Sequence, residues 1–125
     1  MTIAEVSAKY GLTNDTLRYY EKVGLIPAVH RSKSGIRDYG PDDLGWVEFI
    51  KCMRSAGLSI EALLEYVTLH QLGDCTIEQR RAILTREREQ LATRIEEMQN
   101  TLCRMDRKIE WYEQNIVKKE ATLVG

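Results

Sequence analysis

The chain has 125 residues, 43% of them hydrophobic and 30% charged, which is a normal balance for one small folded domain or a small domain with one long element. No stretch approaches the ~20 apolar residues that a membrane-spanning helix needs, and the N-terminus lacks the pattern of a signal peptide. The three scattered cysteines give no disulfide framework. Membrane proteins and disulfide-stabilised secreted proteins are therefore excluded, and we expect a cytoplasmic protein.

The net charge is −1, but the charges are unevenly distributed along the chain. Residues 16–37 carry five basic side chains and one acidic, whereas residues 41–75 carry two basic and six acidic. Residues from 76 onward carry ten basic and nine acidic side chains. Because a nucleic-acid binder needs a local basic surface and not a basic total, residues 16–37 are the segment expected to face phosphates.

Two short helices are predicted at the N-terminus. Thr2 and Thr13 have the chemistry of N-caps, and Gly11 and Gly24 are residues of the kind that ends a helix. Two helices of this length, joined by so short a turn, are typical of a helix-turn-helix unit. The second of them is the predicted recognition helix.

A β-hairpin, or wing, is expected after these helices. Two short runs, residues 26–31 and 36–39, flank a polar turn that contains Gly35.

A second helix pair is predicted next. Its first helix runs from Asp42 or Asp43 to Ser55, a turn follows over residues 56–58, and Ser59 caps a second helix that ends near His70.

The last segment is predicted to be one long helix. Thr76 and Gln79 have the spacing of a capping box at its start, and neither proline nor glycine follows until Gly125. Its apolar residues alternate at intervals of four and three, which is a heptad seam: Leu91, Ile95, Met98, Leu102, Met105, Ile109, Tyr112 and Ile116. Such a helix spans about 60 Å, too far to fold onto a small head, so the seam predicts a homodimer.

The predicted architecture is mainly α-helical. We expect a winged helix-turn-helix head over residues 1–74, a coiled-coil dimerisation helix over residues 76–119 and a short tail over residues 120–125. The heptad pattern by itself suits a parallel pair of helices as well as an antiparallel pair.

Several motifs together resemble the MerR family of bacterial transcription regulators. They are residues 3–7 (IAEVS), 11–13 (GLT), 16–21 (TLRYYE), 24–26 (GLI), 37–39 (RDY) and 56–60 (AGLSI). The resemblance implies an antiparallel coiled coil between two subunits and binding to a palindrome in double-stranded promoter DNA. It also implies that the bound DNA is bent and untwisted, which realigns an overlong promoter spacer for RNA polymerase.

The start of the recognition helix is the first candidate DNA contact. Thr13, Asn14 and Thr16 place short polar side chains where backbone N–H groups and the helix dipole favour phosphates or base edges. The alternative for Thr13 is capping alone, and the alternative for Asn14 and Thr16 is simple solvent exposure.

Further DNA contacts are expected on the same helix and around the hairpin. The resemblance implies phosphate contacts at Arg18 and Tyr19, although Arg18 has an alternative ion pair with Glu21. Three residues that flank the hairpin are expected to grip the DNA backbone: Arg31, Arg37 and Tyr39. Tyr39 has the alternative of packing the wing onto the head.

Two cysteines are candidate sensors. Helical spacing places Cys52 at the edge of the apolar face of its helix, beside Phe49 and Ala56, and the alternative for Cys52 is a small packing residue. Its presence in the third helix makes the chain similar to the NmlR/AdhR-like branch of the family, which responds to aldehyde and thiol stress. Cys75 precedes the long helix, where the positive end of the helix dipole favours a thiolate.

Other functions are less well supported by the sequence. We expect no enzyme, no cofactor and no metal site, because no nucleophile–base pair, phosphate loop or metal motif is present. A metal-responsive regulator of the same family is one alternative. A coiled-coil adaptor whose head binds protein is another, favoured by the near-neutral total charge and the acidic second helix pair.

Overall fold

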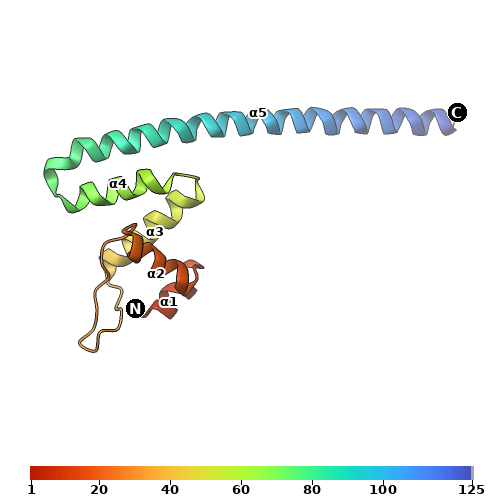
Figure 1. Ribbon diagram of the computed structural model, residues 1–125. Helices are drawn as coiled ribbons and strands as arrows, with labels where there is room; N and C mark the ends of the chain where they lie inside the picture. Colours follow the sequence, from red (N-terminus) through yellow and green to blue (C-terminus); the bar gives the residue numbers. More distant parts are fainter. Residues whose placement is uncertain (125) are drawn as a thin grey trace. The chain divides into compact units, whose positions relative to one another are not determined.

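The structure is a computed structural model that describes the backbone of residues 1–124 and the side chains of residues 1–116. Its described part is helical, with no strand (Figure 1). The elements are α1 (Ile3–Tyr10), α2 (Asn14–Val23), α3 (Pro41–Ser55), α4 (Ile60–Gln71), the 3₁₀-helix η1 (Asp74–Thr76) and α5 (Ile77–Val124). The chain divides into two compact units, residues 1–88 and the residues from 89 onward, so the first turns of α5 belong to the head.

The predicted helix-turn-helix is confirmed, together with its caps. The hydroxyl of Thr2 accepts a hydrogen bond from the backbone N–H of Glu5, and that of Thr13 accepts one from Thr16. Gly11 and Gly24 end the two helices with φ of 67° and 87°, a left-handed conformation that glycine adopts without steric cost. The two helices are therefore set by local residue chemistry.

The second helix pair is also confirmed, with one small difference in its start. Helix α3 begins at Pro41 and not at Asp42 or Asp43, because Pro41 suits the first helical position, where no N–H is needed. Ser59 caps α4 as predicted, by accepting from the backbone N–H of Ala62.

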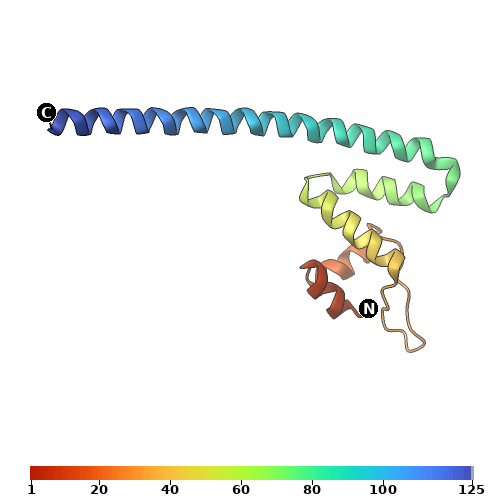
Figure 2. The same ribbon diagram turned by 180° about the vertical axis from the view of Figure 1, so that it is seen from behind.

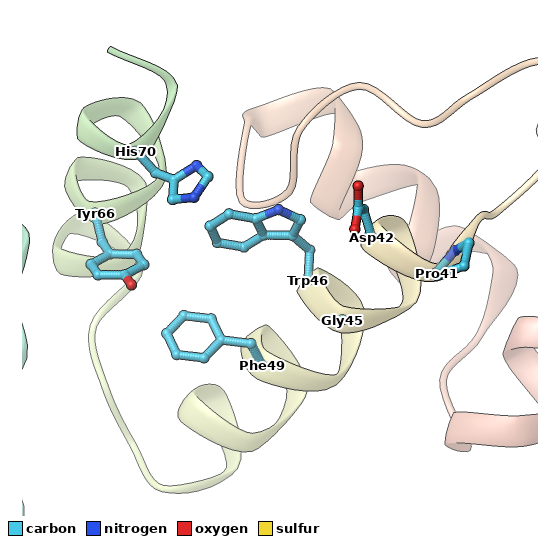
Figure 3. A pocket seen from close by; sticks show the side chains of 7 residues that line it. All are labelled: Pro41, Asp42, Gly45, Trp46, Phe49, Tyr66 and His70. Carbon is cyan, nitrogen blue, oxygen red and sulfur yellow. The ribbon is translucent and has the colours of Figure 1, made fainter. Parts of the chain in front are cut away.

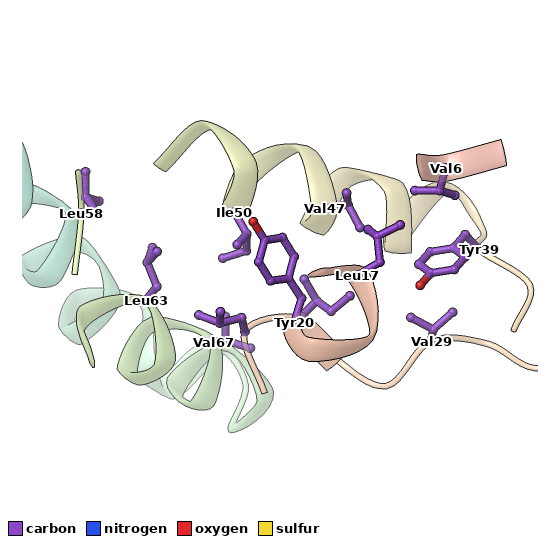
Figure 4. Close-up of a cluster of buried hydrophobic side chains, with 12 residues drawn as sticks. Val6, Leu17, Tyr20, Val29, Tyr39, Val47, Ile50, Leu58, Leu63 and Val67 are labelled. Carbon is purple, nitrogen blue, oxygen red and sulfur yellow. The ribbon is translucent and has the colours of Figure 1, made fainter. Parts of the chain in front are cut away.

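A single hydrophobic core holds the head together (Figure 4). It contains Leu17 and Tyr20 from α2, Val47 and Ile50 from α3, and Leu63 from α4, all of them buried. Burying side chains of this size contributes about 1.5–3 kcal/mol each. The recognition helix is thus held on its inner face, which leaves the opposite face exposed.

The predicted hairpin is reduced to a loop with one bridge. The loop between α2 and α3 extends away from the helices of the head in both views (Figures 1 and 2). Arg31 and Arg37 form an isolated antiparallel bridge, supported by hydrogen bonds from Ser32 N to Ile36 O at 2.8 Å and from Asp38 N to His30 O at 2.7 Å. We call residues 30–38 the wing. A two-residue ladder is too short to count as a pair of strands.

The predicted capping box at Thr76 is wrong. Thr76 is buried, and its hydroxyl lies 2.6 Å from the backbone oxygen of Leu69 and 2.7 Å from that of Gly73, while it accepts from Arg80 Nε at 3.1 Å. The hydroxyl therefore serves the C-terminal end of α4 and not the first turn of α5. It joins the two helices, which lie side by side and antiparallel (Figures 1 and 2).

The two ends of α5 differ in what they bury. In the first turns Ile83 and Glu87 are buried. Further along, Leu91 is half-buried, and the other seven seam residues are exposed: Ile95, Met98, Leu102, Met105, Ile109, Tyr112 and Ile116. A row of exposed apolar side chains at heptad spacing is a surface that needs a partner.

None of the helices described for residues 1–124 is both long and apolar enough to cross a membrane.

Candidate nucleic-acid interface

The N-terminus of α2 presents an ordered polar turn. Thr13 is exposed, and its hydroxyl accepts from Thr16 N at 3.0 Å and shares a 2.8 Å hydrogen bond with the Thr16 hydroxyl. Capping of α2 by Thr13 is therefore confirmed. Asn14 and Thr16 are half-buried. With its hydroxyls already positioned, this turn offers donors and acceptors to a nucleic acid without having to be ordered first.

Arg18 and Tyr19 lie on the exposed face of α2. Tyr19 is 45% exposed. Arg18 Nη1 lies 3.1 Å from the Asp15 carboxylate, so the alternative ion pair with Glu21 is wrong. Because both partners of the Arg18–Asp15 pair are well exposed, the pair contributes little and does not hold Arg18 away from a phosphate.

Glu21 instead fastens the wing to α2. Its Oε1 accepts from Arg37 Nε at 2.7 Å, and its Oε2 accepts from Val29 N at 2.8 Å. Burial acts to raise the pKa of Glu21, but the hydrogen bonds from Arg37 and Val29 outweigh it and leave the pKa lowered. Sequence reasoning missed this pair, because the two residues are 16 positions apart and no local pattern links them.

The three residues expected to flank the hairpin have different surroundings. Arg31 is exposed and donates from Nη1 to the Gly35 carbonyl at 3.1 Å, so its guanidinium lies along the wing. Arg37 is half-buried, and its guanidinium forms an ion pair with the Glu21 carboxylate. Tyr39 is only 2% exposed, with its ring between Val6 and Val29 (Figure 4). For Tyr39 the structure thus favours packing over DNA contact, because a buried ring does not reach a ligand.

A groove beside the recognition helix contains two cations that sequence reasoning did not single out. It has a volume of about 410 Å³, and Thr16 and Tyr19 of α2 line it together with Lys51 and Arg54 of α3. Lys51 donates to the Tyr10 carbonyl, and Arg54 donates to the Leu58 carbonyl at 2.7 Å. The available signal was a basic pair spaced i, i+3 in an otherwise acidic segment. In the structure Lys51 and Arg54 line the same groove as Tyr19, a residue of the predicted interface.

The candidate sensor cysteines are both exposed. Cys52 was expected at the edge of the apolar face of its helix, and its side chain is exposed in the structure, while Val47 and Ile50 of α3 face the core. Cys75 lies in η1, with its sulfur 3.7 Å from the Leu72 carbonyl. Among the residues with described side chains, no three histidines, cysteines or carboxylates come together in a group able to hold a metal ion.

An N-capped helix with an exposed face, a wing fastened to it and cations in the adjoining groove define a helix-turn-helix nucleic-acid-binding protein. Residues 1–69 match the family model described as MerR HTH family regulatory protein, and residues 44–107 match the model described as MerR, DNA binding. The chain therefore belongs to the MerR family of helix-turn-helix transcription regulators.

Known relatives agree with this assignment. The HTH-type transcriptional regulator AdhR of Bacillus subtilis is 63% identical over 91 residues, which are 73% of this chain and 65% of the relative. The chain thus spans just under two thirds of that relative's length. The crystal structure of a putative MerR family transcriptional regulator from Listeria monocytogenes is similar with a TM-score of 0.93, at 45% identity over 98% of this chain and 93% of the other. HiNmlR, a MerR family regulator lacking the sensor domain and bound to promoter DNA, has a TM-score of 0.83, at 29% identity over 90% of both chains.

Proposed function

We propose that this protein binds a palindromic operator in promoter DNA as a homodimer and regulates transcription by changing the shape of that DNA. The observation that carries the proposal is the exposed face of α2, which places its polar first turn, Arg18 and Tyr19 beside the groove with Lys51 and Arg54. HiNmlR, which shares this fold, is bound to promoter DNA in its structure.

The contacts divide into two kinds. The first turn of α2, with Thr13, Asn14 and Thr16, suits base edges and the adjacent phosphates in a major groove. Phosphates are held by the cations and tyrosine around it, namely Arg18, Tyr19, Arg31, Lys51 and Arg54. We assign Arg37 a positioning role, since its guanidinium holds the wing through Glu21. Tyr39 is left out of the interface because its ring is buried.

The proposed dimer uses the exposed seam of α5, in an antiparallel pair as the family resemblance implies. In this division the head extends to residue 88, because the first turns of α5 belong to its compact unit, and the dimerisation segment follows in α5, which runs to Val124; the expected boundaries at residues 74, 76 and 119 are replaced by these. Two heads related by a two-fold axis match a palindrome. Phosphate contacts at both half-sites then hold a bent, untwisted duplex, and RNA polymerase reads the realigned promoter.

Selection of bound duplexes from a random pool tests this function. We expect a palindrome with two related half-sites, whose affinity falls steeply with salt because several phosphates are neutralised. Binding to random duplex with the same affinity and the same salt dependence would contradict sequence-specific recognition. No binding to any duplex would favour the adaptor function in its place.

We propose that the signal is a small electrophile, such as an aldehyde, that reacts at Cys52. Exposure of the thiol gives a small molecule direct access. The sulfur adds to the carbonyl carbon of formaldehyde, the C=O π bond and the S–H bond break, and the thiol proton ends on the oxygen, directly or through water, to give an S-hydroxymethyl adduct. Since Cys52 lies one helical turn from the half-buried Phe49, the adduct changes the polarity of the outer face of α3.

A promoter–reporter strain measures this directly. Formaldehyde should induce the wild type and the Cys75→Ala variant equally, and induction should be lost in Cys52→Ala while DNA binding without the aldehyde stays unchanged. Full induction in Cys52→Ala overturns the assignment. Loss in Cys75→Ala alone would move the sensor to η1.

A further inference from the structure

The acidic residue at the start of the recognition helix, Asp15, is held less firmly than the other carboxylates of residues 1–40. Each of the others accepts a hydrogen bond of 2.8–3.1 Å from a backbone N–H or from the N-terminal ammonium: Glu5, Glu21 and Asp38. Asp15 instead pairs with the side chain of Arg18 at 3.1 Å, and its own side chain is 95% exposed. The fold therefore leaves the Asp15 carboxylate available to a ligand.

Asp15 also has the most exposed polar group of the first turn of α2 that capping does not use. Its neighbours Asn14 and Thr16 are half-buried. The hydroxyls of Thr13 and Thr16 are hydrogen-bonded to each other, and that of Thr13 also caps the helix. Because this end of a recognition helix is the part that meets base edges in a helix-turn-helix protein, we expect the Asp15 carboxylate to enter the major groove.

Binding of DNA removes the partner that Asp15 has in the free head. Arg18 lies one helical turn later on the same face of α2, and in the proposed interface its guanidinium moves to a phosphate. The carboxylate is then left in a groove bounded by phosphates, where it needs a hydrogen-bond donor. The major groove offers two such donors, the N4 amino group of cytosine and the N6 amino group of adenine, whereas guanine and thymine present acceptors there.

We propose that Asp15 is a specificity-determining residue, which accepts a hydrogen bond from the amino group of one base, cytosine or adenine, in each half-site. A guanine or thymine in its place sets an acceptor against the carboxylate and is rejected. Because the two heads are related by symmetry, the same requirement appears at two symmetry-related positions of the palindrome. The inference deepens the DNA-binding function proposed above and rests on it.

The same carboxylate weakens binding to DNA of the wrong sequence. Residues 16–37, which directly follow Asp15, carry five basic side chains and one acidic. Basic side chains attract the phosphates of any duplex, and the negative charge of Asp15 opposes this attraction wherever no amino group meets it. Asp15 therefore raises specificity partly by lowering the affinity for all other sequences.

Base substitutions in the selected operator test the assignment. Each position of one half-site, with its symmetry-related partner, is changed to the other three base pairs, and fluorescence anisotropy measures the affinity. We expect the wild type to prefer the amino-bearing base at one position by roughly tenfold or more, and the base selected there, cytosine or adenine, identifies the amino group. Asp15→Ala should lose this preference, keep the preferences at the other positions and bind random duplex more tightly than the wild type does.

Asp42→Ala is the matched control for Asp15→Ala. Asp42 is an exposed residue in the first turn of α3, and it lines an aromatic groove of about 520 Å³ together with Trp46 and His70 (Figure 3). None of the residues that line this groove belongs to the proposed DNA interface. Asp42→Ala changes the net charge as Asp15→Ala does, but it should leave every base preference unchanged. An equal gain in affinity for random duplex in both variants would assign that gain to net charge and overturn the role of Asp15 in weakening it.

A second set of variants separates direct reading of the base from an effect that acts through Arg18. In Arg18→Gln the ion pair is absent, so a carboxylate that only positions the arginine has no remaining effect. We expect the preference at the assigned position to persist in Arg18→Gln and to be lost in the double variant with Asp15→Ala. Loss of the preference in Arg18→Gln alone overturns direct reading.

Failure of this inference is distinguishable from failure of the proposed function. An Asp15→Ala variant that keeps every base preference of the wild type overturns the role of Asp15 and leaves DNA binding standing. A wild-type protein without a preference at any position overturns both.

Discussion

Arg18 is the residue on which the DNA interface most directly depends. Its guanidinium is exposed and forms a surface ion pair with Asp15, and such a pair is weak enough for a phosphate to replace Asp15 at little cost. We predict that Arg18→Gln lowers affinity for all duplex sequences and flattens the slope of log affinity against log salt by about 0.9, one phosphate contact. Fluorescence anisotropy over a salt series measures this.

The control for this prediction is Arg107→Gln, which removes an exposed arginine of α5 outside the head. It should change neither the affinity nor the salt slope, and both variants should keep the thermal stability of the wild type. An unchanged slope in Arg18→Gln would remove this residue from the interface.

Glu21 makes the attachment of the wing dependent on pH. Its pKa in the folded protein is lowered from the ordinary value of 4.5, against the effect of burial, by the hydrogen bonds from Arg37 and Val29. A group with a lowered folded pKa adds stability above its unfolded pKa and loses it as the pH falls through the folded value. Glu21 therefore stabilises the head at neutral pH, and this stabilisation is lost below pH 4.5.

We predict that Glu21→Gln lowers the free energy of unfolding at pH 7 by about 1–2 kcal/mol, and that the difference from the wild type shrinks as the pH falls below 4.5. Urea unfolding at a series of pH values measures it. Glu48→Gln, an exposed carboxylate of α3, should be neutral throughout. A difference that stays constant to low pH would mean that the carboxylate charge is not the cause.

At the scale of the elements, the junction of α4 and α5 depends on one buried hydroxyl. Thr76 lies within hydrogen-bond distance of Leu69 O and Gly73 O and accepts from Arg80. We predict that Thr76→Val, which keeps the shape, lowers the free energy of unfolding of the head by about 1–3 kcal/mol because buried polar partners are left unsatisfied.

Thr85→Val is the matched control for Thr76→Val. The Thr85 hydroxyl also bonds a backbone carbonyl of α5, that of Arg81 at 2.9 Å, but it is exposed, so water replaces the lost bond. Its loss should change stability by less than about 0.5 kcal/mol. Equal effects of the two variants in urea unfolding would show that burial of Thr76 does not matter.

The wing shows how an element can follow its sequence pattern only in part. The two alternating runs around Gly35 predicted a hairpin. In the structure the chain reverses direction there, but the described residues form only one β-bridge, between Arg31 and Arg37. Both arms are bound to Glu21: the backbone N–H of Val29 in the first arm donates to its carboxylate and is lost to strand pairing, and the Arg37 side chain in the second arm donates to the same carboxylate. Attachment to α2, rather than strand pairing, determines where the wing lies.

At the scale of the whole molecule, the exposed seam predicts association. Leu102 lies mid-seam and is exposed in the single chain. We predict that Leu102→Asp places a charge in the interface and raises the dimer dissociation constant by several orders of magnitude, because a buried unpaired charge costs several kcal/mol. Sedimentation velocity at micromolar concentration should find a wild-type dimer and a variant monomer.

Asn100→Asp serves as the control for Leu102→Asp, since it adds the same charge at an exposed position off the seam. This variant should remain dimeric. Both variants should keep a folded head, because residues 1–88 form a compact unit of their own. A dimeric Leu102→Asp variant would show that the seam is not the interface.

The helix-turn-helix unit and the caps at Thr2, Thr13 and Ser59 could be predicted from the sequence, whereas the cap predicted at Thr76 was wrong. Thr13 and Gly24 form hydrogen bonds with residues only three or four positions away, so helix caps of this kind can be predicted from the sequence. The heptad seam could also be predicted from the sequence, because it depends only on the spacing of apolar residues along one helix. The family motifs added the expected function, which the comparisons support.

Tertiary packing determines which of the predicted site residues remain accessible. Tyr39 went into the core, Arg37 became bound to Glu21, and Thr76 turned to α4 although its spacing suited a cap on α5. The same packing left Cys52 exposed and brought Arg54 to Tyr19. These outcomes depend on how the elements pack against one another, and burial and hydrogen bonding that follow from packing are not encoded by a local period.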